Sequence, residues 1–302
     1  MLKTAYQWHR PLMLFTLSMV VLTPIAAFGM LLDDRLLVDS PIWFKPFKFA
    51  VSFVLYSASL AWFISMLEGR AHRIAWWLGT VSALVGLGEM AVIVGQVVRG
   101  KRSHFNFETP LDTALFSAMG IMVVILWAAN LVIAVMLFRK RFDNPAKAWT
   151  IRFSLVIALV GMAVGFVMTQ PRAGQSPEKG VLGSHSIGGP DGGSYMPLTG
   201  WSTVHGDLRI GHFVGMHALQ ILPLLIALAG RRANARLAWV ISGGYLGATL
   251  LVIWQALRGQ PLIKPDALTL TVAAAIAVAT ALGVVWARQS RTTTIEKELV
   301  PA

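Results

Sequence analysis

The segment PLMLFTLSMVVLTPIAAFGMLL, residues 11–32, contains no charged side chain. A transmembrane helix needs roughly 20 mostly apolar residues to cross the bilayer core. The run is also longer than the apolar part of a secretory signal peptide, which covers about 7–15 residues. No convincing small-residue cleavage pattern follows it. We therefore expect residues 11–32 to form a retained first membrane span.

The composition extends this expectation to the whole chain. Its 302 residues are 56% hydrophobic and 13% charged, whereas soluble domains carry about 25% charged residues. This balance predicts an all-α integral membrane protein. The net charge of +12 does not indicate a nucleic-acid partner, because Lys and Arg cluster at the ends of apolar runs, where topology signals lie. The absence of cysteine excludes disulfides, thiolate metal ligands and cysteine nucleophiles.

Eight segments are long and apolar enough to span a bilayer. They are residues 11–32, 46–67, 74–98, 113–138, 151–170, 210–229, 237–257 and 267–287. In the fifth segment, Gly161 and Gly165 have the Gly-x-x-x-Gly spacing that favours close helix packing. We expect eight transmembrane helices.

The distribution of charge predicts the orientation. The two termini and the connections after the second, fourth and sixth spans hold 15 of the 26 basic residues and 4 acidic ones; the opposite side holds 11 and 9. The excess of Lys and Arg on cytoplasmic segments predicts that both termini lie in the cytoplasm of a bacterial-type plasma (inner) membrane. Four loops then lie outside: 33–45, 99–112, 171–209 and 258–266. Loop 171–209 is rich in Gly, Ser and Pro; we expect its Gly-rich part to be mobile, His185 to be solvated, and its last ten residues to fold onto the helices.

Matching motifs predict an internal repeat. Residues 96–100 read QVVRG and residues 255–259 read QALRG, and each is followed by an outer loop and by an Asp just before the next span. The same alignment places Lys48 opposite His212. Four spans return the chain to the side of the membrane on which it started, so a second set of four would run in the same direction. We therefore expect two parallel four-helix repeats, with the first half at 1–144 and the second half at 145–302.

Polar residues form a layer in the outer half of the predicted bundle. At 1.5 Å of rise per residue, His217 lies about 12 Å and Gln220 about 16 Å below the outer end of their span. Glu89 lies about 15 Å below the outer end of the third span. Ionisable residues inside a membrane usually face the bundle interior or a cavity. Glu89 and His217 are therefore the candidate catalytic or proton-carrying residues, although a Glu89 that only bonds to a neighbouring helix is also compatible with the sequence.

Two histidines of the sixth span are candidate cofactor ligands. His212 and His217 could bind haem iron, relay protons or bond to neighbouring helices, but they point about 140° apart on one helix. Arg209, His212 and Gln220 share a stripe that we expect to face a pocket. The other candidate cofactor-binding residues are Gln96, Arg99, Lys48 and His104; their cations could clamp an anionic group.

The GQVVRG and PLD segments (95–100 and 110–112) and RIGHFVGMHALQ (209–220) give the layout a weak resemblance to the haem A synthase type of membrane protein. That family has eight spans in two four-helix halves, with histidines in the second and fourth span of each half; here only the sixth span carries them. The resemblance implies a four-helix pocket able to hold a flat cofactor such as haem b or a quinone.

Three functions remain open at this point. The first is a redox or cofactor-handling membrane protein with a polar pocket in the outer half of the bilayer. The second is a transporter of a small anionic solute that uses the same polar layer. The third is a non-catalytic membrane partner of a larger complex, with loop 171–209 as the docking surface. The chain has no Walker loop, no His-Glu-x-x-His and no Gly-x-Ser-x-Gly, so the sequence leaves open whether it catalyses a reaction.

Overall fold

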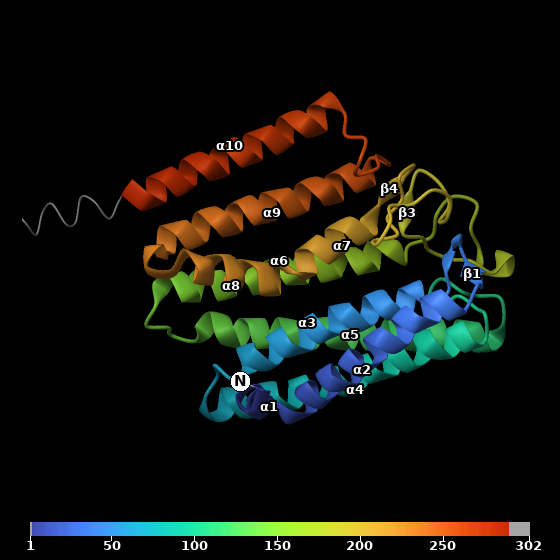
Figure 1. Ribbon diagram of the computed structural model, residues 1–302, viewed down its shortest axis with the longest axis horizontal. Coiled ribbons are helices and arrows are strands. Elements are labelled where there is room, and N and C mark those ends of the chain that lie inside the picture. Colours follow the sequence, from blue (N-terminus) through green and yellow to red (C-terminus); the bar gives the residue numbers. More distant parts are fainter. Residues whose placement is uncertain (1, 290–302) are drawn as a thin grey trace, which may run out of the picture.

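The computed structural model describes residues 2–289, and helices dominate it (Figure 1). The α-helices are α1 (Leu2–Trp8), α2 (Arg10–Leu32), α3 (Phe44–Ile64), α4 (Gly69–Val98), α5 (Pro110–Arg139), α6 (Pro145–Met168), α7 (Leu208–Met216), α8 (Ala218–Ala229), α9 (Ala235–Leu257) and α10 (Ala267–Gln289). Two short 3-10 helices are η1 (Pro177–Lys179) and η2 (Gly230–Arg232). The strands pair as two small antiparallel hairpins, β1 (Leu36–Leu37) with β2 (Ser40–Pro41) and β3 (Ser186–Ile187) with β4 (Gly206–Asp207).

The helices confirm an all-α, multi-pass membrane protein. Seven helices within residues 2–289 are long and apolar enough to cross a bilayer. Helices α7 and α8 together make an eighth crossing if the bent pair counts as one span. The long loops gather at one end of the bundle, while the N-terminus and the end of α10 lie at the other (Figure 1). This arrangement follows from an even number of crossings.

Several helices begin before the spans expected from hydropathy. The Asn144 side chain accepts a hydrogen bond from the Lys147 amide at the start of α6, and Thr109 caps α5 through the Asp112 amide in the same way. Both helices then open with Pro, whose missing N–H is no loss at the first helical position. Capping therefore sets where these helices begin, and hydropathy marks only the part that lipid surrounds.

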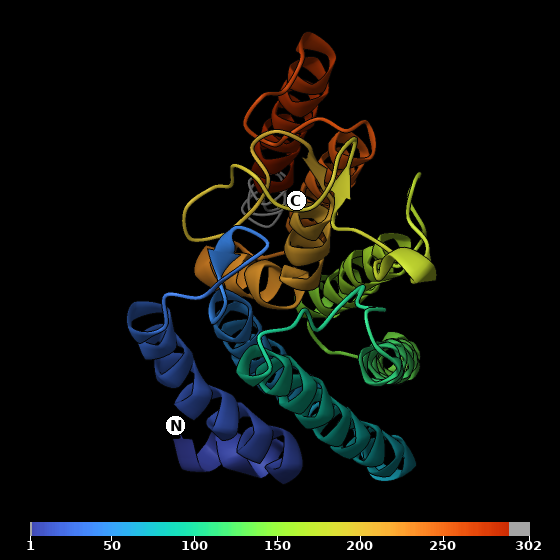
Figure 2. The same ribbon diagram turned by 90° about the vertical axis from the view of Figure 1, so that its right-hand side faces the viewer.

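The helices pack as two groups, α2–α5 and α6–α9, which meet where α5 contacts α6 and α3 contacts α8 (Figure 2). A large core of buried apolar side chains fills the first group and reaches α6 and α8. Helix α10 packs chiefly against α9 and leaves most of its surface to lipid.

The sixth span is not the single continuous helix predicted for 210–229. It breaks at His217, and the axes of α7 and α8 differ by 48°. A continuous helix would pair the Val214 carbonyl with the amide of Ala218; instead this carbonyl accepts a hydrogen bond from the Tyr245 hydroxyl of α9 (2.6 Å). Pro223, inside α8, also removes one helical donor. A break inside a membrane is tolerated when a neighbouring helix satisfies the freed backbone group, as Tyr245 does here.

The Tyr245→Phe variant should lose this hydrogen bond and destabilise the protein by about 1 kcal/mol, the usual value of a polar contact between membrane helices. Thermal denaturation in detergent micelles measures the loss. An unchanged midpoint would show that another group satisfies Val214.

The predicted close packing at Gly161 is confirmed. A Cβ atom placed on Gly161 would lie 2.6 Å from the Met216 amide nitrogen, and one placed on Gly215 would lie 2.5 Å from the Gly161 Cα. Helices α6 and α7 therefore touch backbone to backbone immediately before the break. Only glycine at both positions permits this approach.

Loop 171–209 has defined internal contacts, and Asp191 holds its Gly-rich part together. The Asp191 carboxylate accepts hydrogen bonds from the Ser184 hydroxyl, the amides of His185 and Ser186, and the His185 ring (2.8 Å). Burial opposes ionisation of Asp191, but the His185 ring and these donors keep its pKa well below its usual range. The expectation of a solvated His185 is wrong, because its ring lies half-buried between Asp191 and the Phe105 ring, 4.9 Å away.

Candidate functional site

His217 lies at the break between α7 and α8, where it ends one helix and begins the next. Its side chain is buried (8% exposed). The Phe213 ring packs against the imidazole with 4.1 Å between ring centroids, and Trp201 packs in turn on Phe213. The break thus places a buried imidazole against the Phe213 ring.

A chain of hydrogen bonds fixes which nitrogen of His217 carries the proton. The Gln220 amide nitrogen donates to the Leu55 carbonyl (3.1 Å) and to the Ser59 hydroxyl (2.8 Å) of α3. A carbonyl can only accept, so the Gln220 oxygen must face the His217 Nδ1 atom, 3.0 Å away. Nδ1 is therefore the protonated donor, and Nε2 carries a lone pair. That Nε2 atom is buried and has no hydrogen-bond partner among residues 2–289.

His212 has the same tautomer for a similar reason. Its Nδ1 atom lies 2.8 Å from the Gly161 carbonyl of α6, which can only accept, so Nε2 again keeps its lone pair. The two rings are held by different helices. The His212 ring bonds to α6, and the His217 ring is held to α3 through Gln220. Gln220, which we expected to share a stripe with Arg209 and His212, bonds to His217, three residues before it in the chain.

A second group of polar side chains, the Lys45 cluster, lies between α3, α4 and the loop that follows α4. It consists of Lys45, Glu89 and His104, and Lys45 interacts electrostatically with the other two. Glu89 is 2% exposed, and its Oε1 atom has no hydrogen-bond partner in the described part of the chain. The sequence pointed to Glu89 and His104 but placed Lys45 only in the predicted loop 33–45.

His104 lies among aromatic rings. Phe49, Phe105 and Phe116 each lie with their ring centroids about 6.0 Å from that of the imidazole. Burial, and then the positive charge of Lys45, lower the pKa of His104 well below 6.5. The imidazole is therefore neutral in the folded protein.

This shift predicts a loss of stability in acid. As the pH falls through about 6.5, the unfolded chain gains a proton at His104 and the folded protein does not, so folding loses up to about 1.4 kcal/mol per pH unit. Thermal denaturation midpoints should fall between about pH 7.5 and about pH 5.5, and less steeply for His104→Phe than for the natural chain. Equal slopes would contradict a neutral, buried His104.

The other predicted site residues have protein partners. Lys48 donates to the Thr199 carbonyl (3.0 Å) and lies over the Phe44 ring. Arg209 pairs with the fully buried Asp207 and also donates to the Gly200 carbonyl. These contacts anchor the end of loop 171–209 to α3 and α7.

Gln96 and Arg99 belong to a separate network at the end of the bundle where the long loops gather. Both donate to the buried Asp112 carboxylate at the start of α5, and Gln96 also donates to the Arg102 carbonyl. This network joins the ends of α4 and α5. The structure does not bring it together with the His217 site.

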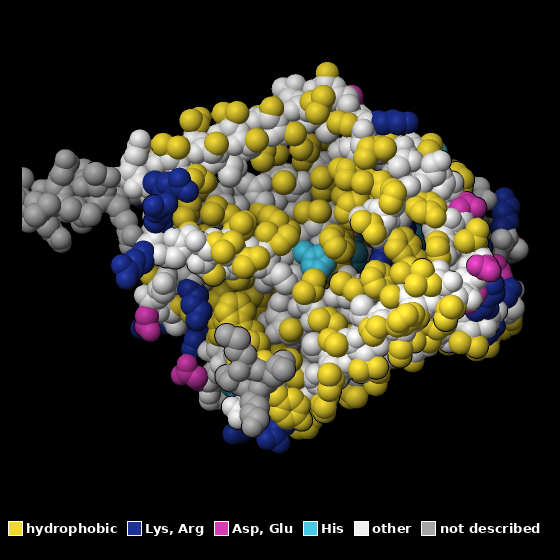
Figure 3. Space-filling view, viewed as in Figure 1, with side chains coloured by type: hydrophobic (Ala, Val, Ile, Leu, Met, Phe, Trp, Pro, Cys, Tyr) yellow, Lys and Arg dark blue, Asp and Glu magenta, His cyan; other side chains and the backbone are white. Residues whose placement is uncertain are grey.

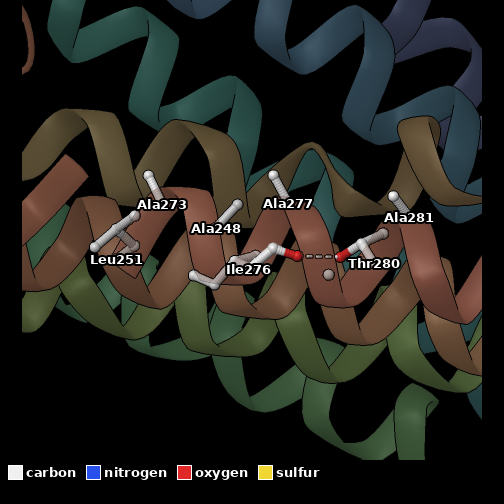
Figure 4. A pocket seen from close by; sticks show the side chains of 8 residues that line it. Ala248, Leu251, Ala273, Ile276, Ala277, Thr280 and Ala281 are labelled. Atoms are coloured by element: carbon white, nitrogen blue, oxygen red, sulfur yellow. Dashed lines mark hydrogen bonds between the residues drawn. The ribbon is translucent and has the colours of Figure 1, made fainter. Parts of the chain in front are cut away.

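Within residues 2–289, no three His, Asp or Glu side chains are grouped to hold a metal ion. An apolar pocket between α9 and α10 is lined by small residues, and the Thr280 hydroxyl there donates to the Ile276 carbonyl of its own helix (Figure 4). This pocket contains none of the predicted site residues.

The space-filling view shows histidine and basic side chains in a recess of the apolar surface, at the level where α7 meets α8 (Figure 3). Exposed apolar side chains flank this level on both α3 and α8: Val51, Leu55, Ile221 and Leu224. These histidine and basic side chains are therefore accessible from the side of the bundle that lipid surrounds. No protein-family profile, curated protein or solved structure matches this chain.

Proposed function

We propose that this membrane protein binds the polar head group of a membrane-soluble redox cofactor at His217, and that a quinol is the class of ligand that fits best. The observation that carries the proposal is the buried Nε2 lone pair of His217, which lacks a partner within residues 2–289. An unsatisfied buried acceptor is costly unless a ligand satisfies it. A quinol hydroxyl donates a hydrogen bond, whereas the oxidised quinone offers only acceptors. The reduced form should therefore bind more tightly.

The surroundings of His217 suit such an amphiphile. The Phe213 ring offers a flat apolar face to the head group. The exposed apolar side chains of α3 and α8 would contact the isoprenoid tail, and the recess in Figure 3 would admit it from lipid. Because Gln220 bonds to α3, the ligand would lie where the two helical groups meet.

Haem b is the second candidate ligand, and it would use the same nitrogen atom. Metal-binding histidines usually donate their other ring N–H to a carbonyl or carboxylate, as His212 and His217 do here. The two rings are held by different helices, so we propose that His217 alone would ligate the haem iron. The resemblance to haem A synthase remains a prediction of the sequence.

Two measurements on protein purified in detergent test the proposal and separate the two ligands. Addition of a decyl-tailed benzoquinol should raise the denaturation midpoint in a saturable manner, and the oxidised quinone should do so more weakly. Both effects should disappear in His217→Phe and persist in His72→Phe, a matched substitution at the opposite end of the bundle. A Soret band in the purified protein, before or after haem addition, would favour haem if the His217→Phe variant lacks it. No stabilisation by quinol and no Soret band would overturn the proposal.

We also propose that the halves 1–144 and 145–302 are parallel repeats whose termini both lie in the cytoplasm of a bacterial-type plasma membrane. In both halves, the Gln of the Gln-x-x-Arg-Gly segment donates to a carbonyl six positions later, and the Arg pairs with the Asp near the start of the next helix. The pairs are Gln96 with Arg102, Gln255 with Pro261, Arg99 with Asp112 and Arg258 with Asp266. These shared contacts support a duplication, and the charge asymmetry of the loops supports the orientation.

A further inference from the structure

Helices α9 and α10 meet along one interface, and the apolar pocket of Figure 4 lies on it. A Cβ atom on Gly283 would lie 2.7 Å from the Val240 side chain, and one on Gly244 would meet the Thr280 hydroxyl. Gly244 and Thr280 line one end of the pocket, and Ala248 lines it one turn further along α9. Val240, Gly244 and Ala248 are four residues apart and so share one face of α9. The two helices are therefore packed closely at Val240 and separated by a pocket beyond Gly244.

The pocket is suited to a hydrocarbon chain. Its volume is about 470 Å³, and apart from Thr280 its lining is apolar or glycine. The Thr280 hydroxyl already donates to the Ile276 carbonyl, so it does not require a polar ligand. Because α10 packs chiefly against α9 and leaves most of its surface exposed, the pocket lies among the lipid chains of the membrane. The acyl chain of a lipid therefore matches this pocket better than a polar solute does.

Arg236 and Trp286 mark the level of the lipid head groups at one end of the interface. The Arg236 guanidinium lies over the Trp286 ring, 4.8 Å from its centre, and so joins the two helices there. Trp286 is 52% exposed, and an exposed tryptophan near the end of a span is typical of the membrane interface. Gly244 lies eight residues beyond Arg236, about 12 Å along the helix, which is within the roughly 15 Å depth of one leaflet. The chain of a lipid whose head group lies at Arg236 therefore reaches the pocket.

This end of the interface carries positive charge without acidic partners. Arg232 and Arg288 lie at the same end as Arg236, and none of the three forms a salt bridge within residues 2–289. Asp266, the one acidic residue that the sequence contains between positions 230 and 289, lies at the opposite end and pairs with an arginine there. An anionic head group is therefore favoured over a zwitterionic one.

We propose that the interface between α9 and α10 is a binding site for an anionic phospholipid, with the phosphate at Arg236 and an acyl chain in the pocket. Arg232 and Arg288 add attraction for the head group, and the small residues of the pocket leave the space that the chain fills. The site shares no residue with the His217 site and does not depend on the quinol proposal.

Phosphatidylglycerol and phosphatidylcholine with the same oleoyl chains, each added to the full chain in detergent micelles, test the proposal. Phosphatidylglycerol should raise the denaturation midpoint in a saturable manner and phosphatidylcholine should do so more weakly, while glycerol phosphate, which lacks chains, should have no effect. Arg236→Gln should weaken phosphatidylglycerol binding about fivefold, and Arg236→Lys, which keeps the charge, should retain most of it. Lys264→Gln, at the opposite end of α10, should leave binding unchanged.

Ala277→Phe tests the pocket itself. The new ring would fill space that the acyl chain needs, so binding of both lipids should weaken about tenfold, the equivalent of about two methylene groups that lose their site. Ala279→Phe is the matched control, because Ala279 lies on the same helix but does not line the pocket. The arginine variants change an exposed side chain and remain decisive even if Ala277→Phe fails to fold.

Three results would overturn the proposal. They are equal stabilisation by the two lipids, full retention of phosphatidylglycerol binding in Arg236→Gln, and equal lipid binding by Ala277→Phe and Ala279→Phe. A second copy of the chain in place of the lipid would appear as a dimer that Ala277→Phe dissociates, and this result would also overturn it.

Discussion

Replacing Gly161 with alanine is expected to lower the free energy of unfolding by about 3 kcal/mol or more. The new Cβ would lie 2.6 Å from the Met216 amide nitrogen and 2.7 Å from the Gly215 Cα. These neighbours are backbone atoms, so α6 and α7 must separate instead of a side chain moving aside. The His212 ring, which donates to the Gly161 carbonyl, would lose its position at the same time. Thermal or denaturant unfolding in micelles measures the change.

Gly120→Ala is the matched control for this prediction. Gly120 also lies inside a membrane helix, α5, but a Cβ placed there meets no atom within 4 Å. Alanine should therefore be tolerated and could add about 0.5–1 kcal/mol, since glycine is the less favourable residue inside a helix. If Gly161→Ala were as stable as Gly120→Ala, α6 and α7 would not make backbone contact.

Replacing Gln220 with leucine is expected to weaken quinol or haem binding by about 10–100-fold, the usual cost of losing the group that orients a ligating histidine. Leucine has a similar volume but cannot accept the His217 Nδ1 proton. The ring would then be free to rotate and to change tautomer, so Nε2 would no longer be held as the acceptor. The same titrations that test the proposed function measure the effect.

Ser59→Ala separates this orienting role from general packing. It removes one bond to the Gln220 amide and leaves the bond to the Leu55 carbonyl, which alone fixes the direction of the amide. Ligand affinity should stay within about threefold of the natural chain. Equal losses in Gln220→Leu and Ser59→Ala would argue that both act by loosening the contact between α3 and α8.

The sequence predicted the spans well because each depends on a local property. Hydropathy over about 20 residues requires no knowledge of neighbouring helices. The helix ends were less accurate, since capping residues such as Thr109 and Asn144 lie outside the apolar windows. Alternating spans also placed the long loops at one end, as Figure 1 shows.

The site was predicted in part only, because its contacts join distant segments. Glu89, His104 and His217 stood out as polar residues in or beside apolar spans. The partners that define their chemistry did not: Gln220 bonds to α3, 161–165 residues away along the chain. Gly215 before the break and Pro223 after it were the available local signals.

Lys45 and Asp191 were missed for a related reason. A lysine beside aromatic residues at the start of a span is typical of a headgroup contact, and only the fold shows that Lys45 and His104 both lie close to the Phe49 ring. Asp191 lies in a Gly-rich segment without periodicity, so nothing in the sequence indicated that it organises the loop. Its role depends on amides that only the folded loop brings together.

The proposed function depends on a His217 that holds a proton on Nδ1 and presents an unprotonated Nε2 at the helix break. Nitrogen-15 NMR of histidine-labelled protein tests it most directly, with the His217 signals assigned by their loss in His217→Gln. Without ligand, we expect His217 to be protonated at Nδ1 only, and we expect quinol to shift the Nε2 signal. A His217 protonated at Nε2 would contradict it.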